Sequence, residues 1–161
     1  MKARLAALAP LLVPALMVAA CDRPAARPDA GAATVSVTLH PAGGPARALT
    51  VEAARTEAEQ AKGLMYRANL PRDGGMLFFP YPPDGGPPRV TSFWMKNTPS
   101  ALDIVFLRRD GTVARIAENT VPFSEAPVPS GEPVAAVLEL AGGRAAELGL
   151  SEGDRVDLPA R

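Results

Sequence analysis

The sequence predicts one mainly β domain of the α+β class, closed or nearly closed into a barrel and carrying two short helices. Apolar runs of strand length recur along the chain between clusters of Pro and Gly, which number 18 and 14. Two segments have the pattern of short helices, and no long βαβ unit is recognisable. Closing the sheet into a barrel would leave no edge strand unpaired.

The composition limits both the domain count and the class of function. The 161 residues suffice for one domain, and 17 basic against 17 acidic residues give no positive excess for nucleic-acid binding. A single Cys rules out a disulfide within the chain, and one Cys with one His cannot complete a Cys/His zinc site. We therefore predict neither a metal nor a cofactor.

Residues 1–20 have the pattern of a secretory signal peptide. Lys2 and Arg4 precede an apolar run that ends at Ala20 and that two prolines interrupt. The run is shorter than a comfortable membrane span of about 20 residues, so export is favoured over a membrane-spanning helix.

The end of this segment, Val18-Ala19-Ala20-Cys21, resembles the lipobox of bacterial lipoproteins. The resemblance implies that Cys21 carries the lipid and begins the mature protein, which would be anchored to a membrane and face the periplasm. Asp22 resembles the inner-membrane retention signal of enteric lipoproteins, which favours that membrane. The alternative is an ordinary cleaved signal peptide followed by a free Cys. After Cys21, residues up to 33 are Ala, Pro, Asp, Arg and Gly, which predicts a disordered tether before a globular domain at 34–161.

The first elements of the domain are predicted from local patterns. Apolar and polar residues alternate from Thr34 to His40, which predicts a half-buried strand, and residues 47–53 return as the second strand of a hairpin. Thr56 and Glu59 have capping-box spacing, so a helix is expected from Glu57 to Lys62.

The rest of the domain reads as short strands and one more helix. Runs of strand length lie at 76–79, 92–96, 102–107, 113–118 and 134–140. Asp110-Gly111 is a strong hairpin signal between two of them, and residues 80–88 form a Pro-rich surface loop. A helix at 143–148 and a last strand through Val156 and Leu158 complete the prediction.

A set of short motifs between Val51 and Val156 resembles the domain-of-unknown-function family numbered 192, whose members are small exported prokaryotic proteins. The motifs are Gly63-Leu64-Met65-Tyr66-Arg67, Gly75-Met76-Leu77-Phe78, Phe93-Trp94-Met95-Lys96-Asn97-Thr98, Leu102-Asp103-Ile104-Val105-Phe106, Leu138-Glu139-Leu140 and Gly153-Asp154-Arg155-Val156. The resemblance implies a compact, largely β, exported domain and carries no assigned activity. Residues 98–102 depart slightly from the family pattern.

The predicted strand at 102–107 reads as buried on both faces, yet it contains Asp103. A lone buried carboxylate costs several kcal/mol, so Asp103 should be paired, hydrogen-bonded or protonated. Lys96 is its nearest candidate partner and Arg67 the second. In the motif that precedes this strand, alternation would place Trp94 and Lys96 on one face and Met95 and Asn97 on the other.

We hypothesise that polar side chains converge here over an aromatic floor, in a cleft that binds a small polar ligand. The candidate residues are Arg67, Trp94, Lys96, Asn97, Asp103 and Glu139. The alternative is structural: Asp103 and Lys96 form an internal ion pair and Trp94 fills the core. An envelope protein docked on Trp94 or on the loop at 80–88 is a further possibility.

Catalysis has few candidate residues in this sequence. His40 is the only His and lies outside the motifs, which disfavours a Ser/His or Cys/His nucleophile pair. Asp103 and Glu139 remain as an acid/base pair for a cell-envelope hydrolase or lyase. Met65, Met76 and Met95 could hold Cu(I), but Met in such motifs more commonly fills the core.

Overall fold

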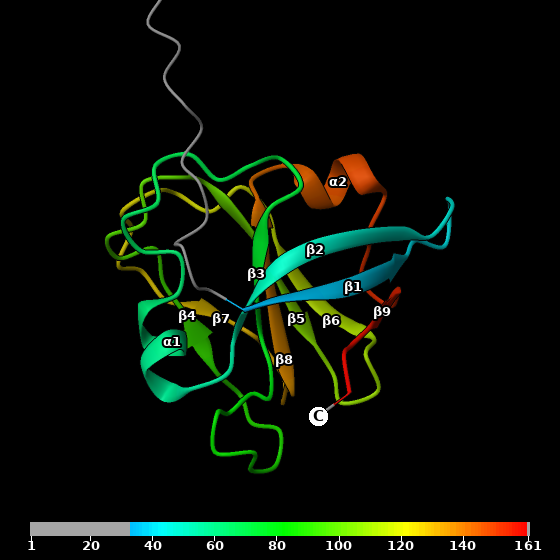
Figure 1. The fold of residues 1–161 in the computed structure, drawn as a ribbon, viewed down its shortest axis with the longest axis horizontal. Coiled ribbons are helices and arrows are strands. Elements are labelled where there is room, and N and C mark those ends of the chain that lie inside the picture. The colour runs from blue at the N-terminus through cyan, green and yellow to red at the C-terminus, as the bar shows by residue number, and fades with distance from the viewer. Residues whose placement is uncertain (1–32, 161) are drawn as a thin grey trace, which may run out of the picture.

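The computed structural model describes residues 33–160 as one β-rich domain (Figure 1). The predicted signal peptide, the lipidation site at Cys21 and nearly all of the predicted tether lie outside the described residues. The strands are β1 (Thr34–His40), β2 (Arg47–Ala54), β3 (Gly75–Phe78), β4 (Ser92–Phe93), β5 (Leu102–Leu107), β6 (Val113–Ala117), β7 (Val128–Pro129), β8 (Ala136–Ala141) and β9 (Arg155–Asp157). The helices are α1 (Glu57–Lys62) and α2 (Arg144–Leu148). No helix of the described residues is long and apolar enough to cross a membrane.

Seven strands form one sheet in the order β6-β5-β8-β3-β2-β1-β9. The two end strands approach each other, because Thr112 just before β6 forms an isolated bridge with Arg155 of β9. The Val156 N–H also donates to the Gly111 carbonyl at 2.8 Å. Gly111 has a φ of 85°, and a Cβ there would collide with the Val156 carbonyl oxygen, so the glycine permits the closure. The prediction of a nearly closed barrel is confirmed.

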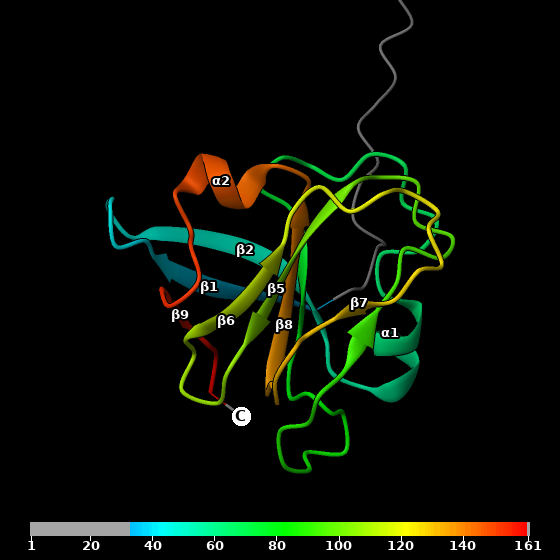
Figure 2. The ribbon, with the colours of Figure 1, turned by 180° about the vertical axis from the view of Figure 1, so that it is seen from behind.

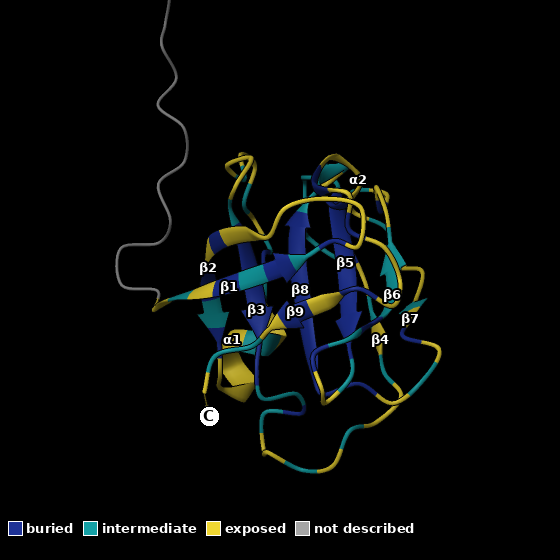
Figure 3. Ribbon diagram, turned by 90° about the vertical axis from the view of Figure 1, so that its right-hand side faces the viewer, coloured by how far each residue is buried: buried dark blue, intermediate teal, exposed yellow. Residues whose placement is uncertain are grey.

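The strands bury two apolar clusters, one on each face of the sheet. The barrel interior takes side chains from every strand of the sheet, such as Leu39, Val51, Leu77 and Val105. The outer face of β3, β5 and β8 carries a second cluster beneath the loops. Figure 3 shows these three strands as almost wholly buried. They therefore form the middle layer of the domain, as the doubly apolar pattern of residues 102–107 predicts.

The covering layer contains a small sheet in which β4 pairs with β7 beside α1 (Figure 2). The predicted strand at 92–96 ends at Phe93, because the chain turns and the Thr98 N–H donates to the Met95 carbonyl at 3.0 Å. Asn97 takes a φ of 55° in this turn, a conformation that Asn tolerates. The strand is therefore shorter than predicted, although Trp94 and Lys96 still lie together while Met95 is buried, as the alternation predicts.

Both predicted helices are present. The Thr56 side chain accepts from the Glu59 N–H while the Glu59 carboxylate accepts from the Thr56 N–H, so the capping box of α1 is confirmed. The carboxylate also accepts from the Arg55 N–H at 2.8 Å, and these bonds lower the pKa of Glu59. Gly143 precedes α2 with a φ of 79°, which places the first N–H groups of that helix against β5.

Candidate functional site

Asp103 lies inside the barrel, on the same face of β5 as Val105 and Leu107, and is fully buried. Its Oδ1 accepts from the backbone N–H groups of Asn119 at 2.8 Å and Gly143 at 2.9 Å. Its Oδ2 accepts from the Ala145 N–H at 2.8 Å. The expected ion pair with Lys96 or Arg67 is wrong, because backbone donors from two chain segments stabilise this carboxylate. Through these hydrogen bonds, Asp103 of β5 fixes the position of the start of α2 at the end of the barrel.

Arg67 is paired with a different carboxylate, that of Glu52 on β2. Its Nη2 lies 2.7 Å from Glu52 Oε2, and its Nη1 contacts Glu52 Oε1, so the pair is bidentate. Glu52 is buried, and the fork geometry compensates the loss of its hydration. The Arg67 carbonyl accepts from the Ser100 hydroxyl at 3.0 Å, which joins the loop at 63–70 to the loop before β5.

Lys96 and Asn97 contribute to the outer surface of the covering loops. Lys96 Nζ lies 5.0 Å from the centroid of the Trp94 ring and 4.0 Å from Glu125 Oε1. The Asn97 side-chain amide donates to the Tyr66 hydroxyl at 2.9 Å, and the Tyr66 N–H donates to the Asn97 carbonyl at 2.7 Å. These contacts hold the turn in place.

Glu139 occupies the outer face of β8, where it is 4% exposed. Its neighbours on adjacent strands are Met76 of β3 and Ile104 of β5, both buried and apolar. Burial raises the pKa of Glu139 from 4.5 to about 8. Its Oε2 has no hydrogen-bond partner among the described residues, which is a costly arrangement for a buried polar atom.

A pocket of about 350 Å³ opens between α1 and the segment around β4, and Glu139 lies at its floor. Leu64, Phe78 and Thr98 are the other buried lining residues. The exposed lining residues form the mouth: Glu57, Ala61, Lys62, Arg89, Ser92 and Trp94. Of the predicted site residues, Glu139 and Trp94 line this pocket, while Arg67, Lys96, Asn97 and Asp103 do not.

Gln60 also lines the pocket and is a site residue that the sequence did not reveal. Its amide nitrogen donates to the Ala54 carbonyl at 3.0 Å and to the Pro80 carbonyl at 2.8 Å. Only a nitrogen can donate to both carbonyls, so Oε1 is the remaining amide atom. That oxygen is buried and lacks a partner in the part of the chain that the structure describes. A Gln on a short surface helix gives no sequence signal for this role.

Aromatic rings pack around Phe93 beside the pocket. The Phe93 centroid lies 5.1 Å from that of Phe78 and 5.7 Å from that of Tyr81, and all three residues line the cavity. Trp94 is 48% exposed at the mouth. Trp94, predicted as the aromatic floor of a cleft with Asp103 and Glu139, therefore shares this pocket with Glu139 and not with Asp103.

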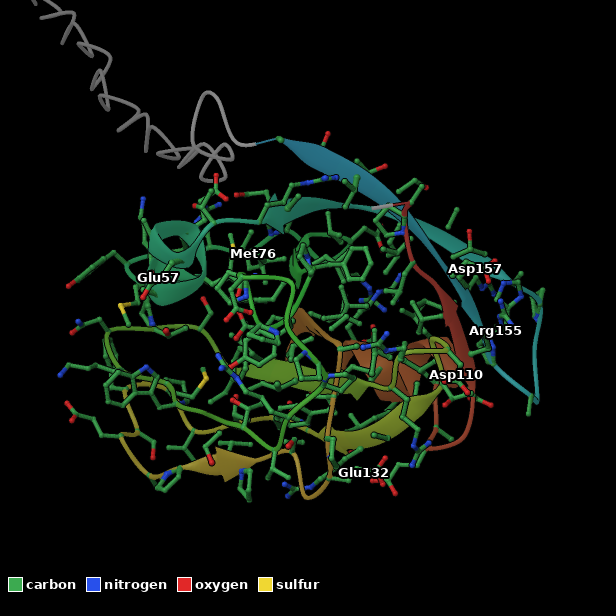
Figure 4. All side chains as sticks on the ribbon, turned by 90° about the horizontal axis from the view of Figure 1, so that it is seen from below. Glu57, Met76, Asp110, Glu132, Arg155 and Asp157 are labelled. Atoms are coloured by element: carbon green, nitrogen blue, oxygen red, sulfur yellow. The ribbon has the colours of Figure 1, made fainter. Side chains whose placement is uncertain are left out.

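The far end of the domain carries a separate group of charges. Figure 4 shows Glu57 toward one end and Asp110, Arg155 and Asp157 at the other, with Met76 between them. There His40 Nε2 lies 2.7 Å from Asp157 Oδ2, and this contact with a second one from Arg155 lowers the pKa of Asp157. Because these groups satisfy one another on the surface, the polar pocket beside α1 is the stronger site.

Two of the three methionines of the motifs are core side chains. Met76 and Met95 belong to the outer apolar cluster, and the Met95 sulfur accepts from the Thr120 hydroxyl at 3.1 Å. Met65 lines the pocket. Within residues 33–160, no group of three or more His, Cys, Asp or Glu side chains is placed to hold a metal ion.

One family profile and two solved structures are similar to this chain. The profile of DUF192, described as "Uncharacterized ACR", matches residues 38–158. A crystal structure from Sinorhizobium meliloti 1021 is 45% identical, with a TM-score of 0.72 over 78% of this chain and 94% of that one. Its description proposes a role as a transcription regulator. A protein of unknown function from Novosphingobium aromaticivorans DSM 12444 is 43% identical, with a TM-score of 0.74 over 86% of this chain and 94% of that one. No curated protein is significantly similar to the chain.

Proposed function

The chain belongs to the DUF192 family of uncharacterized proteins, and we propose that its domain binds a small organic molecule in the pocket between α1 and β4. One observation carries the proposal: a buried carboxyl group at the pocket floor has an oxygen that finds no partner among the residues that the structure describes. Structures rarely leave such a group unsatisfied, and a ligand would supply the missing hydrogen bond. Aromatic walls with a few convergent polar groups are typical of small-molecule sites.

The alternative of a hydrolase or lyase using Asp103 and Glu139 lacks the geometry it needs. Asp103 pairs with Leu140, so it faces the barrel interior, whereas Glu139 faces the covering loops on the opposite side of the sheet. The two carboxyl groups do not share a cleft. Transcription regulation, as described for the Sinorhizobium protein, is not carried over, because the chain has no excess of basic residues.

The binding proposal is tested with two alanines on the same helix. Ala61 lines the pocket mouth and Ala58 does not, and both are exposed on α1. We expect compounds from a chemically diverse panel to raise the melting temperature of the full chain, purified in mild detergent. Ala61→Phe should weaken the binding of such compounds at least tenfold by filling the mouth, while Ala58→Phe should leave it unchanged.

The binding proposal fails if no compound of the panel binds, or if the compounds that bind affect both phenylalanine variants alike. Titration followed by NMR of the full chain locates each bound compound, so that binding elsewhere on the surface is distinguished from binding in the pocket.

We propose further that the protein is exported and held at the membrane by a lipid on Cys21, with the domain in the periplasm. The lipobox-like Val18-Ala19-Ala20-Cys21 and the absence of any other Cys support this. Expressed in a bacterial host, the chain should incorporate labelled palmitate and sediment with membranes, and Cys21→Ser should do neither. Label retained by Cys21→Ser, or wild-type protein found only in the soluble fraction, would rule out the anchor.

A further inference from the structure

Two side chains that line the same pocket each have an oxygen without a partner among the described residues, and together they indicate the chemistry of its ligand. Glu139 Oε2 and Gln60 Oε1 are both buried, and each lacks a hydrogen-bond donor among residues 33–160. The amide of Gln60 is held by its two donor bonds to the Ala54 and Pro80 carbonyls, so its oxygen cannot turn away to find water. A ligand that satisfies this oxygen must bring a donor, since an amide oxygen only accepts.

The aromatic side chains favour positive charge in the same cavity. Phe78, Tyr81 and Phe93 line the pocket, and their rings attract a cation within about 6 Å of a centroid. The Glu139 carboxyl adds a full negative charge when it ionises, at a point where Met76 and Ile104 on the adjacent strands are apolar. A cation at this floor would be paired with the carboxylate and desolvated by the rings, which strengthens both interactions.

We propose that the pocket takes an organic primary ammonium ion, whose N–H groups satisfy Glu139 and Gln60 while its carbon chain lies against the aromatic walls. The inference rests on the proposed binding function and names the class of its ligand. A primary ammonium has three donors and no acceptor, which matches two acceptor oxygens better than an amide or a carboxylate does.

The remaining charged groups of the pocket lie at its mouth. Glu57, Lys62 and Arg89 line the opening and are exposed. Arg67 and Glu52 are paired with each other and do not line the pocket. The entrance therefore carries both acidic and basic side chains, whereas Glu139 is the acidic side chain at the buried floor of the pocket. Ammonium binding would displace the proton of Glu139, whose pKa burial raises to about 8. Below about pH 8, the affinity for the ammonium ion should therefore increase about tenfold for each unit by which the pH is raised.

The test uses four probes with one carbon chain and different head groups. Butylammonium, butyltrimethylammonium, butyramide and butyrate are titrated against the full chain in detergent and followed by NMR shifts of pocket amides. We expect butylammonium to bind at least tenfold more tightly than butyramide and butyrate at about pH 8. Butyltrimethylammonium should also bind less tightly, because it has no N–H to donate. Proton release on binding, measured calorimetrically in buffers of different ionisation enthalpy, should accompany the two cationic probes and not butyramide or butyrate.

Two Glu-to-Gln substitutions distinguish the contribution of the pocket floor to binding from that of the mouth. Glu139→Gln should weaken butylammonium at least tenfold and remove its pH dependence, whereas Glu57→Gln should change its affinity less than threefold. If butyramide or butyrate bound in the pocket more tightly than butylammonium, the ammonium assignment would be overturned, while the proposed binding function would stand. Failure of all four probes would also overturn it, and the wider panel with Ala61→Phe then decides the binding function separately.

Discussion

Replacing Asp103 with Ala should lower the free energy of unfolding by about 4 kcal/mol, since three backbone N–H groups, one buried and two partly buried, would lose their acceptor at once. The N–H groups belong to Asn119, Gly143 and Ala145, which lie in two segments distant in sequence. Each unsatisfied buried donor costs about 1–3 kcal/mol, and a cavity adds to the loss. Urea denaturation at neutral pH measures the change as a shift in the midpoint with little change in slope.

A graded series of variants tests this explanation of Asp103. Asp103→Asn keeps an oxygen that can accept from Asn119 and Gly143 but presents an amide to Ala145, so we expect about half the loss. Glu118→Ala removes an exposed carboxylate on the neighbouring strand connection and should change stability by less than about 0.5 kcal/mol. Equal stability of the wild type and Asp103→Ala would show that the three bonds contribute nothing.

Glu139 should make the domain less stable as the pH rises, and Glu139→Gln should abolish this loss. Burial raises the pKa of Glu139 to about 8 in the folded domain, against 4.5 for an ordinary Glu. The folded state therefore binds the proton more tightly than the unfolded state. Its contribution is fully present below about pH 4.5 and is lost as the pH rises through about 8.

For one proton, the free energy of unfolding changes by about 1.4 kcal/mol per pH unit. Relative to the wild type, the free energy of unfolding of Glu139→Gln should therefore rise by up to about 5 kcal/mol from pH 4.5 to about pH 8. Chemical denaturation at about pH 4 and pH 8 measures the difference, with the exposed Glu118→Gln as control. A difference between Glu139→Gln and wild type that does not change with pH would contradict a protonated carboxyl in this position.

Elements with local signals were predictable to within a residue or two. The alternation from Thr34 to His40 and the capping box before Glu57–Lys62 gave the bounds that β1 and α1 have. The strand predicted at 92–96 was too long, because the turn at Asn97 depends on bonds to residues far along the chain. Tyr66 donates to the Asn97 carbonyl and Met95 donates to that of Ser124.

The site was predicted in part, and the missing part depends on tertiary contacts. A carboxyl in an apolar strand is visible in the sequence and indicates Asp103, whereas Glu139 is indicated by the Leu138-Glu139-Leu140 motif. Their sequence surroundings do not show that Asp103 accepts from three backbone N–H groups while Glu139 Oε2 has no donor within residues 33–160. The pocket lies between α1 and the β4 segment, and the residues of neither element predict that the two lie side by side.

The carboxyl group of Glu139 is buried at the floor of a pocket, and its Oε2 lacks a partner in the described part of the chain. The proposed binding site depends on this group. Its ionisation is observed most directly by carbon-13 NMR of the full chain labelled at the glutamate side-chain carboxyls, titrated from about pH 3 to pH 10. The structure predicts that one glutamate signal titrates near pH 8, well above the others, and is missing from Glu139→Gln. Titration of every glutamate below about pH 6 would contradict the account.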